Sequence, residues 1–166
     1  MHLRLVTIAD LPVLRHWHSQ PHVIAARGDD APIDWDEELR RQGQGCELLI
    51  AELDGRPIGF MEILDPTRDD DRYWGAIEDG FRCIDIWIGE EADLSKGFGT
   101  RMMRLATEHC FADPAVDAIL IDPLVSNERA HRFYERLGFV RVDRRTFGDD
   151  DCYVYRLDRP FSGRGS

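Results

Sequence analysis

A glycine-rich turn between an apolar strand and a helix constrains the fold of this chain more than any other feature of its sequence. Residues 82–89 are apolar enough for a buried strand, and residues 97–112 place apolar side chains on one helical face. Between them, residues 94–100 read Leu-Ser-Lys-Gly-Phe-Gly-Thr. Glycines there leave the first helical amides open to a ligand, at the positive end of the helix dipole. The turn therefore predicts a phosphate-binding site.

The charges around this turn agree with that prediction. Lys96 is the only lysine in the chain, and Arg101 and Arg104 follow it. In a protein of formal net charge −11, this is where a polyanion is expected to bind. Ordinary turn chemistry is the alternative, since neither the dinucleotide nor the Walker phosphate pattern is present.

Hydrophobic periodicity predicts a single α+β domain over residues 1–160, with a flexible tail at 161–166. The Asp54-Gly55 pair predicts a tight hairpin, and Asp34 is suited to begin a short helix. The expected order is β-α-α-β-β-β-α-β-α-β-β, a mixed and mostly antiparallel sheet flanked by helices. Strands are expected at 3–7, 47–53, 57–64, 82–89, 118–122, 140–145 and 153–157, and helices from about 11 to 17, 34 to 42, 97 to 112 and 127 to 137.

Composition limits the class of protein. Hydrophobic residues make up 43% of the 166 positions and aromatic residues 10%, which is typical of a globular domain. No apolar run spans a bilayer and the N-terminus is too polar for a secretory signal, so we expect a cytoplasmic protein. Its four cysteines form no Cys-x-x-Cys pair, which predicts reduced, buried thiols and no metal site.

The charge distribution points to a cationic ligand. Residues 62–93 contain eleven acids and three arginines, whereas residues 94–145 contain nine basic and seven acidic residues. The net negative charge argues against nucleic acid as a partner. An acidic middle beside a mildly basic second half suits one cationic and one anionic ligand, although a solvated acidic surface is an open alternative.

A second motif lies downstream of the glycine turn. Residues 127–139 read Asn-Glu-Arg-Ala-His-Arg-Phe-Tyr-Glu-Arg-Leu-Gly-Phe. This resembles the Asn-x-x-Ala-x-x-x-Tyr-x-x-x-Gly-Phe signature of the GNAT superfamily of N-acetyltransferases, and the resemblance covers nearly the whole chain. It implies the GNAT fold and acetyl-CoA as co-substrate, with its pyrophosphate on the glycine turn. Leu94 departs from the Gln or Arg that usually opens the turn. The residues implied in binding acetyl-CoA are Trp87, Ile88, Lys96, Gly97, Phe98, Gly99, Thr100, Asn127 and Ala130.

Within that superfamily the chain is most similar to aminoglycoside 6′-N-acetyltransferases. Residues 55–59, 82–85 and 94–100 carry this resemblance, together with Asp122-Pro123 before Ser126-Asn127. It implies Asp85 as the catalytic carboxylate beside the acceptor amine and Tyr134 as the group that serves the coenzyme A sulfur. It also implies that the acceptor contacts Asp71, Trp74, Asp85 and Asp122.

The chemistry of acetyl transfer suits these residue types. Main-chain amides near Trp87 are suited to polarise the thioester carbonyl, and a phenol at Tyr134 to protonate the leaving thiolate. Alternation places Asp85 on the same face as Trp87, where a carboxylate must be paired or open to a ligand. A structural ion pair with Arg82 is the alternative, and Asp122 suits capping the next turn equally well. A carboxylate also stabilises an ammonium, so Asp85 is expected to position the amine first and remove its proton second.

Two other functions remain open at this stage. One is an N-acyltransferase acting on a lysine-type amine in siderophore assembly, which would favour basic residues in the acceptor site. The other is a non-catalytic acyl-CoA-binding module. Neither the site of acetylation on an acceptor nor the choice between monomer and dimer follows from the sequence.

Overall fold

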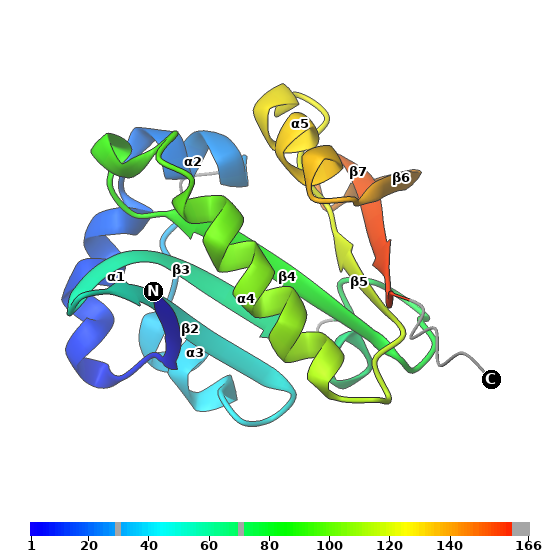
Figure 1. The fold of residues 1–166 in the computed structure, drawn as a ribbon, viewed down its shortest axis with the longest axis horizontal. Coiled ribbons are helices and arrows are strands. Elements are labelled where there is room, and N and C mark those ends of the chain that lie inside the picture. The colour runs from blue at the N-terminus through cyan, green and yellow to red at the C-terminus, as the bar shows by residue number, and fades with distance from the viewer. Residues whose placement is uncertain (29–30, 70–71, 161–166) are drawn as a thin grey trace.

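The computed structural model describes residues 1–28, 31–69 and 72–160. They form one seven-stranded sheet flanked by five helices, which confirms the α+β class (Figure 1). The sheet order is β1-β2-β3-β4-β5-β7-β6, and every neighbouring pair is antiparallel except β4–β5. The predicted tail at 161–166 lies outside the described residues. The strands are β1 (His2–Leu5), β2 (Cys46–Leu53), β3 (Arg56–Leu64), β4 (Phe81–Ile88), β5 (Ala118–Ile121), β6 (Val140–Phe147) and β7 (Asp150–Asp158).

The predicted element order was wrong by one helix. Three helices lie between the first two strands, not two, and the one that was missed is α2 (Pro21–Arg27). Only Val23 is buried in this helix, so it has little apolar periodicity. The sequence marks this helix only at its two ends, where Pro21 occupies the first helical position and Gly28 ends the helix with φ 91°. The other helices are α1 (Leu11–His18), α3 (Trp35–Arg41), α4 (Phe98–Ala112) and α5 (Glu128–Arg136).

Predictions that rest on local chemistry are confirmed. Asp54 and Gly55 join β2 to β3 with φ angles of 52° and 78°, as a two-residue hairpin with two left-handed positions requires. The Asp34 carboxylate begins α3 by accepting hydrogen bonds from the Asp36 and Glu37 amides, both at 3.1 Å. All four cysteines are buried and unpaired. No helix within the described ranges has the length and hydropathy of a membrane span.

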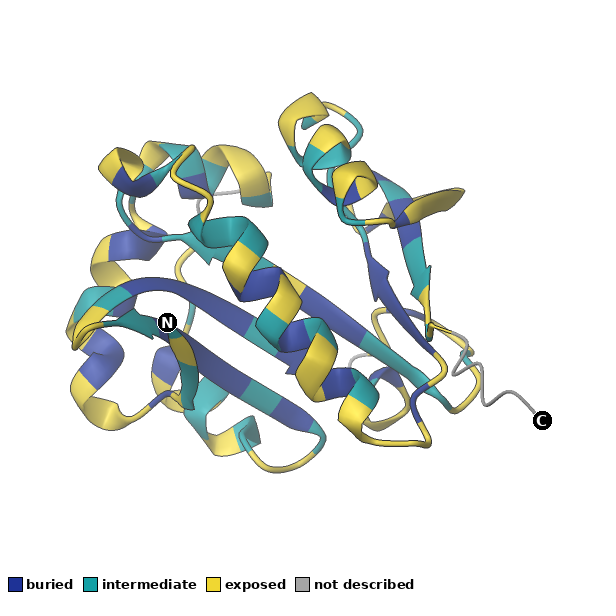
Figure 2. Cartoon of the chain, viewed as in Figure 1, coloured by how far each residue is buried: buried dark blue, intermediate teal, exposed yellow. Residues whose placement is uncertain are grey.

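Each face of the sheet has its own core (Figure 2). On one face, α4 and α5 pack over apolar side chains from the middle of the sheet, including Ile84 and Ile119. On the other, α1 and α3 pack with Trp17 and Trp35 over β2 and β3, and Trp74 packs over the start of β4. The alternation predicted for β4 is confirmed, because Ile84 faces the first core and Trp87 the second.

The sheet splits between β4 and β5. These strands pair only from Phe81–Cys83 to Ala118–Leu120, and beyond that they diverge (Figure 1). The Gly89 amide donates to the Ile58 carbonyl at 2.9 Å. Because main-chain groups alternate in an antiparallel pair, those of Ile86 and Ile88 point away from β3, toward the split. The middle of the sheet therefore has an open strand edge.

Gly89 should be intolerant of any side chain. A Cβ atom there would lie 2.0 Å from Cε2 of Trp17, which is itself buried. Replacing Gly89 by alanine must displace this indole, so we expect a loss of about 2 kcal/mol in the free energy of unfolding, measured by chemical denaturation. Gly148→Ala is the comparison, because a Cβ there would meet no atom within 4 Å, so that any loss comes from its φ of 59°, a backbone strain that Gly89 does not share. Equal losses of unfolding free energy in the two variants would show that the Trp17 side chain moves aside at little cost.

Candidate active site

The glycine turn presents an uncapped helix N-terminus. Gly97 adopts φ 80°, a left-handed conformation that favours glycine, and no side chain caps the helix there. The Arg101 amide donates to the Gly97 carbonyl at 3.2 Å. The amides of the preceding turn have no acceptor inside the helix, because they lie before this first helical hydrogen bond. A Cβ at Gly97 would meet no protein atom within 4 Å. The space beside these amides is open, which fits a phosphate ligand.

An ion pair between a buried carboxylate and a half-exposed arginine holds the loop that leads into this turn. Asp93 is 4% exposed and accepts two hydrogen bonds from Arg56, at 2.6 and 3.2 Å. The Arg56 guanidinium lowers the pKa of Asp93. Lys96 reaches the same carboxylate with Nζ at 3.3 Å, although it stays half-exposed. Lys96, the only lysine in the chain, therefore forms a weak ion pair with Asp93 and faces solvent beside the predicted anion site.

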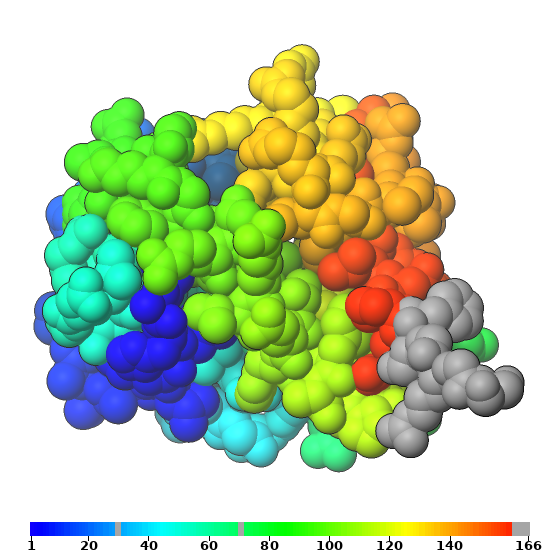
Figure 3. Space-filling model, viewed as in Figure 1, coloured from blue at the N-terminus to red at the C-terminus, as the bar shows by residue number. Residues whose placement is uncertain are grey.

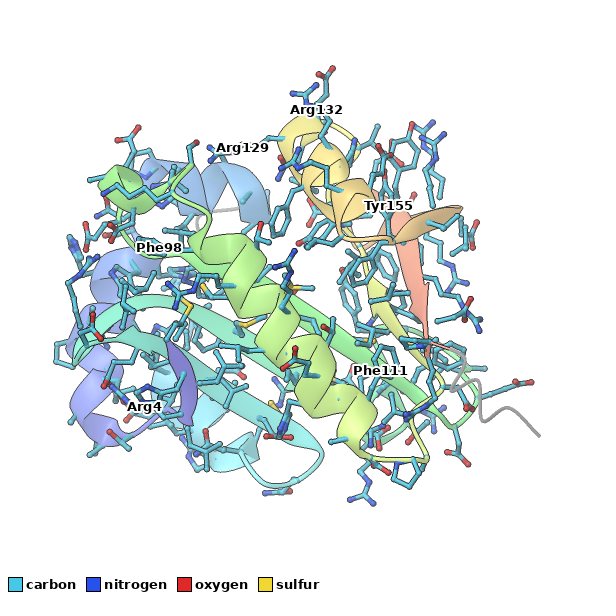
Figure 4. The ribbon with its side chains drawn as sticks, viewed as in Figure 1. Arg4, Phe98, Phe111, Arg129, Arg132 and Tyr155 are labelled. Carbon is cyan, nitrogen blue, oxygen red and sulfur yellow. The ribbon has the colours of Figure 1, made fainter. Side chains whose placement is uncertain are left out.

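Helix α5 faces the glycine turn across a hollow. Its Arg129 donates to the Ser95 hydroxyl at 3.2 Å, and in Figure 4 it points from α5 toward the loop before Phe98. A Cβ at Gly99 would lie 3.4 Å from the Phe133 ring, so a larger residue would crowd α5. Between α4 and α5 the surface is hollowed, with α2 visible behind (Figure 3). The hollow lies on the side of the sheet where α4 and α5 pack.

Two predicted cofactor residues begin α5. The Asn127 side-chain oxygen accepts a hydrogen bond from the Ala130 amide at 3.1 Å and so caps the helix. This contact explains the spacing of the two residues by local structure alone. It uses the carbonyl oxygen of Asn127 and leaves its amide group for another partner.

The open edge of β4 carries an interaction that the sequence did not reveal. The His22 ring, from α2, bonds the Ile88 carbonyl through Nε2 at 2.8 Å. His22 Nδ1 and the indole nitrogen of Trp87 are both buried and have no hydrogen-bond partner among the described residues. Since α2 itself was missed, no local pattern connected His22 with β4.

Tyr134 lies on α5 with its ring 8% exposed. Within the described residues its hydroxyl forms no hydrogen bond, and it is not fully sealed from solvent. Burial and the nearby carboxylates of Asp85 and Asp122 raise the pKa of this phenol. The hydroxyl is therefore protonated at neutral pH and available to a ligand.

Asp85 lies on the opposite face from α4 and is exposed, although it belongs to a central strand. The alternative ion pair is not present, because Arg82 contacts Asp65 at 3.6 Å and Asp113 at 3.3 Å. Surrounding protein atoms displace much of the water around Asp85, and this desolvation raises its pKa against the opposing effect of Arg27. An exposed carboxylate without an ion-pair partner in the described part of the chain is open to a cationic ligand.

Asp122 forms a hydrogen bond with Tyr73, an aromatic residue of the segment between β3 and β4. The Tyr73 hydroxyl donates to it at 2.5 Å, and the Tyr73 ring stacks on Phe147 with centroids 4.4 Å apart. Burial and the Asp85 charge raise the pKa of Asp122 to about 7. Of the residues expected in this segment, Trp74 is only 5% exposed, whereas its neighbour Tyr73 is 48% exposed. Asp71 lies outside the described residues.

A third carboxylate joins this site. Glu62 on β3 is the register partner of Asp85 on β4, so their side chains share one face. Burial and the Asp85 charge raise the pKa of Glu62 to about 7. Glu62, Asp85 and Asp122 form a carboxylate cluster, in which the charge of Asp85 acts on both of the others. On β4 the cluster lies between Trp87, which stacks on Phe60 at 4.4 Å, and the core that holds Trp74.

The chain matches known acetyltransferases over most of its length. An acetyltransferase (GNAT) domain family matches residues 7–147. An aminoglycoside N(6′)-acetyltransferase type 1 from Klebsiella pneumoniae is 33% identical over 147 residues, which cover 84% of this chain and 73% of the relative. A kanamycin resistance protein from Rhizobium radiobacter is 44% identical over 71 residues, which cover 42% of this chain and 66% of that protein.

A solved structure agrees with this match. The aminoglycoside acetyltransferase AAC(6′)-Ib in complex with coenzyme A and kanamycin superimposes with a TM-score of 0.86 at 32% identity, covering 95% of this chain and 94% of that one. The fold and these matches therefore define an acyl-transferring enzyme, with an uncapped helix start on one side of a split sheet and carboxylates on the other. The chain belongs to the GNAT family of acetyltransferases.

Proposed function

We propose that this enzyme transfers an acetyl group from acetyl-CoA to the 6′-amino group of an aminoglycoside. The observation that carries the proposal is the carboxylate cluster, which places three acidic side chains beside exposed and stacked aromatic rings. A polycationic amino sugar offers ammonium groups for the carboxylates and apolar ring faces for the aromatic side chains. The names of the relatives support the same acceptor class.

The donor would bind on the side of α4 and α5. Amides of Phe98, Gly99 and Thr100 would hold its pyrophosphate, with Lys96 free to leave Asp93 for a phosphate oxygen. The open edge of β4 would pair with the amide groups of the pantetheine arm, as an added strand does. Acetyl-CoA supplies the activated thioester, which would reach through the split toward the second face.

The acceptor would bind on that second face. Asp85 would hold the reacting ammonium, while Asp122 would hold another ammonium after giving up its bond from Tyr73. Asp85 then takes the proton from the ammonium, and the neutral amine attacks the thioester carbonyl carbon. Main-chain N–H groups at the open edge of β4, near Trp87 and Ile88, would stabilise the oxyanion. Tyr134 donates its proton to the departing sulfur.

A carboxylate-bearing acceptor fits this site poorly. A lysine-type amine that carries its own carboxylate would meet the negative cluster with like charge. We therefore rank the siderophore-type acyltransferase below the aminoglycoside enzyme.

A coupled assay of coenzyme A release tests the proposal. We expect turnover with kanamycin and ribostamycin, both of which have a 6′-amino group, and none with siderophore precursors or peptide amines. Mass spectrometry with fragmentation should then place the acetyl group on the 6′-nitrogen. Turnover of the peptide amines with none of the aminoglycosides would overturn the assignment.

The remaining properties follow from this function. We infer a single catalytic domain over residues 1–160 and a cytoplasmic location, which its four unpaired, buried cysteines support.

A further inference from the structure

Glu62 is the polar residue of the site that the mechanism above leaves without a role. It lies directly opposite Asp85 in the register of β3 and β4, on the face where the acceptor would bind. Side chains at such facing positions have Cβ atoms about 5 Å apart, so the two carboxyl groups are close neighbours. Two carboxylates held this close repel each other strongly when both are ionised.

Within the described residues neither carboxylate has an ion-pair partner within 4 Å. The arginine that lowers the pKa of Glu62 is Arg41 on α3, which also contacts Glu38 at 2.8 Å and Asp69 at 3.8 Å. The direct partner of Glu62 is the Cys46 thiol, which donates to Oε1 at 3.2 Å. A thiol hydrogen bond is too weak to compensate a second negative charge.

Other ionisable groups of the described residues also act on the pair. Those acting on Glu62 are Cys46 from β2 and Glu38 and Arg41 from α3. Arg27 from α2 lowers the pKa of Asp85. The Asp85 charge in turn raises the pKa of five groups: Tyr73, Cys83 from β4, Asp122, Tyr134 from α5 and Cys152 from β7. Of these groups around Asp85, Arg27 is the only cation, and it also contacts His18 at 2.9 Å.

We propose that Glu62 is a positioning residue that makes Asp85 a stronger base, because the two carboxyl groups share one proton. The proposal rests on the function proposed above and assigns Glu62 its part in that reaction. In the free enzyme the pair holds a single proton. Binding of a polycation compensates both charges and releases this proton to solvent.

The pair then takes up the proton of the reaction. It moves from the acceptor ammonium to Asp85, and relief of the repulsion between Asp85 and Glu62 favours this transfer. The neutral amine forms the new C–N bond as the C–S bond breaks. The second amine proton passes to the sulfur through Tyr134, and the pair keeps the proton it has received when the product leaves, which restores the singly protonated free enzyme; the proton released to solvent is the one lost when the acceptor bound. The balance is one ammonium and one thioester giving one amide, one thiol and one released proton. A lone carboxylate at Asp85 would stabilise the ammonium and so oppose its deprotonation, and the negative charge of Glu62 counteracts this effect.

The test compares Glu62→Gln with wild type. Without its negative neighbour, Asp85 should titrate at lower pH in carboxyl-detected NMR of the ligand-free enzyme. The acid limb of kcat/KM for kanamycin should move the same way, by about one pH unit, and kcat at the plateau should fall. Glu47→Gln is the matched control, because Glu47 lies on β2 against His109 of α4 at 3.0 Å. It should change neither quantity.

The outcomes are separable. An Asp85 titration unchanged in folded Glu62→Gln would overturn the inference, because a merely structural glutamate could leave it in place. If Glu62→Gln does not fold, Asp85→Asn provides the reciprocal measurement, in which Glu62 should titrate below its value near 7. If wild type acetylates no aminoglycoside, the proposed function fails, while the carboxyl titrations still decide whether the pair exists.

Discussion

Asp85→Asn should lower kcat/KM for an aminoglycoside by about 10³-fold while leaving acetyl-CoA affinity unchanged. Asn keeps the size of Asp85 but neither attracts an ammonium nor accepts its proton. Asp85 lies on the opposite face of the sheet from α4 and α5, where the donor would bind, so the two effects should separate. Steady-state kinetics for the acceptor and calorimetry for acetyl-CoA would measure them.

The pH dependence of this variant distinguishes two roles of Asp85. If Asp85 removes the proton, the loss in kcat should shrink as pH rises toward the pKa of the acceptor amine, because the neutral amine then forms in solution. If it only positions the ammonium, the loss should appear in KM. Asp36→Asn is the control, since Asp36 is exposed and contacts Arg15 at 3.5 Å on the protein surface. Wild-type turnover in Asp85→Asn would remove this residue from the mechanism.

Gly97→Asp should weaken coenzyme A binding by about 10- to 100-fold. Its carboxylate would enter the open space beside the first amides of α4, where the pyrophosphate is expected, and repel that dianion. Calorimetric titration of coenzyme A into the variant measures the change. Because no acceptor is present, the result bears on the donor site alone.

Gly55→Asp is the matched control for this variant. Gly55 has φ 78°, close to the 80° of Gly97, and a Cβ at either position would meet no atom within 4 Å. Both substitutions place aspartate in the left-handed region and should cost about 1 kcal/mol of stability each. Only Gly97→Asp should lose affinity for coenzyme A. Equal affinity in the two variants would show that the glycine turn does not hold the pyrophosphate.

The two faces of the sheet divide the proposed reaction. Tyr134 and the glycine turn lie with α4 and α5 on one face, and the carboxylate cluster lies on the other. Strands β4 and β5 pair at three positions only, and the split beyond them joins the two faces. On this proposal the donor and acceptor would bind independently and meet only at the thioester. This separation is why substitutions at Asp85 and Gly97 should affect different ligands.

Features set by neighbouring residues could be predicted from the sequence. The Asp54-Gly55 hairpin, the Asp34 cap and the left-handed start of α4 at Gly97 each depend on the conformational preference of one or two residues. The face on which Asp85 lies follows from simple alternation along β4. The motif of residues 127–139 identified the family because its spacing reflects one helix and its cap.

Tertiary structure alone decided which distant residues meet. Glu62 faces Asp85 because of the register between β3 and β4, and Tyr73 reaches Asp122 from a segment without regular pattern. His22 contacts Ile88 from a short helix that periodicity did not reveal. Strand register and loop packing depend on contacts summed over the whole core, which no short stretch of sequence encodes. Local sequence thus shows the residue types needed for acetyl transfer. The contacts between distant residues, such as that of Glu62 with Asp85, form only in the folded chain, and the proton affinity of Asp85 depends on them.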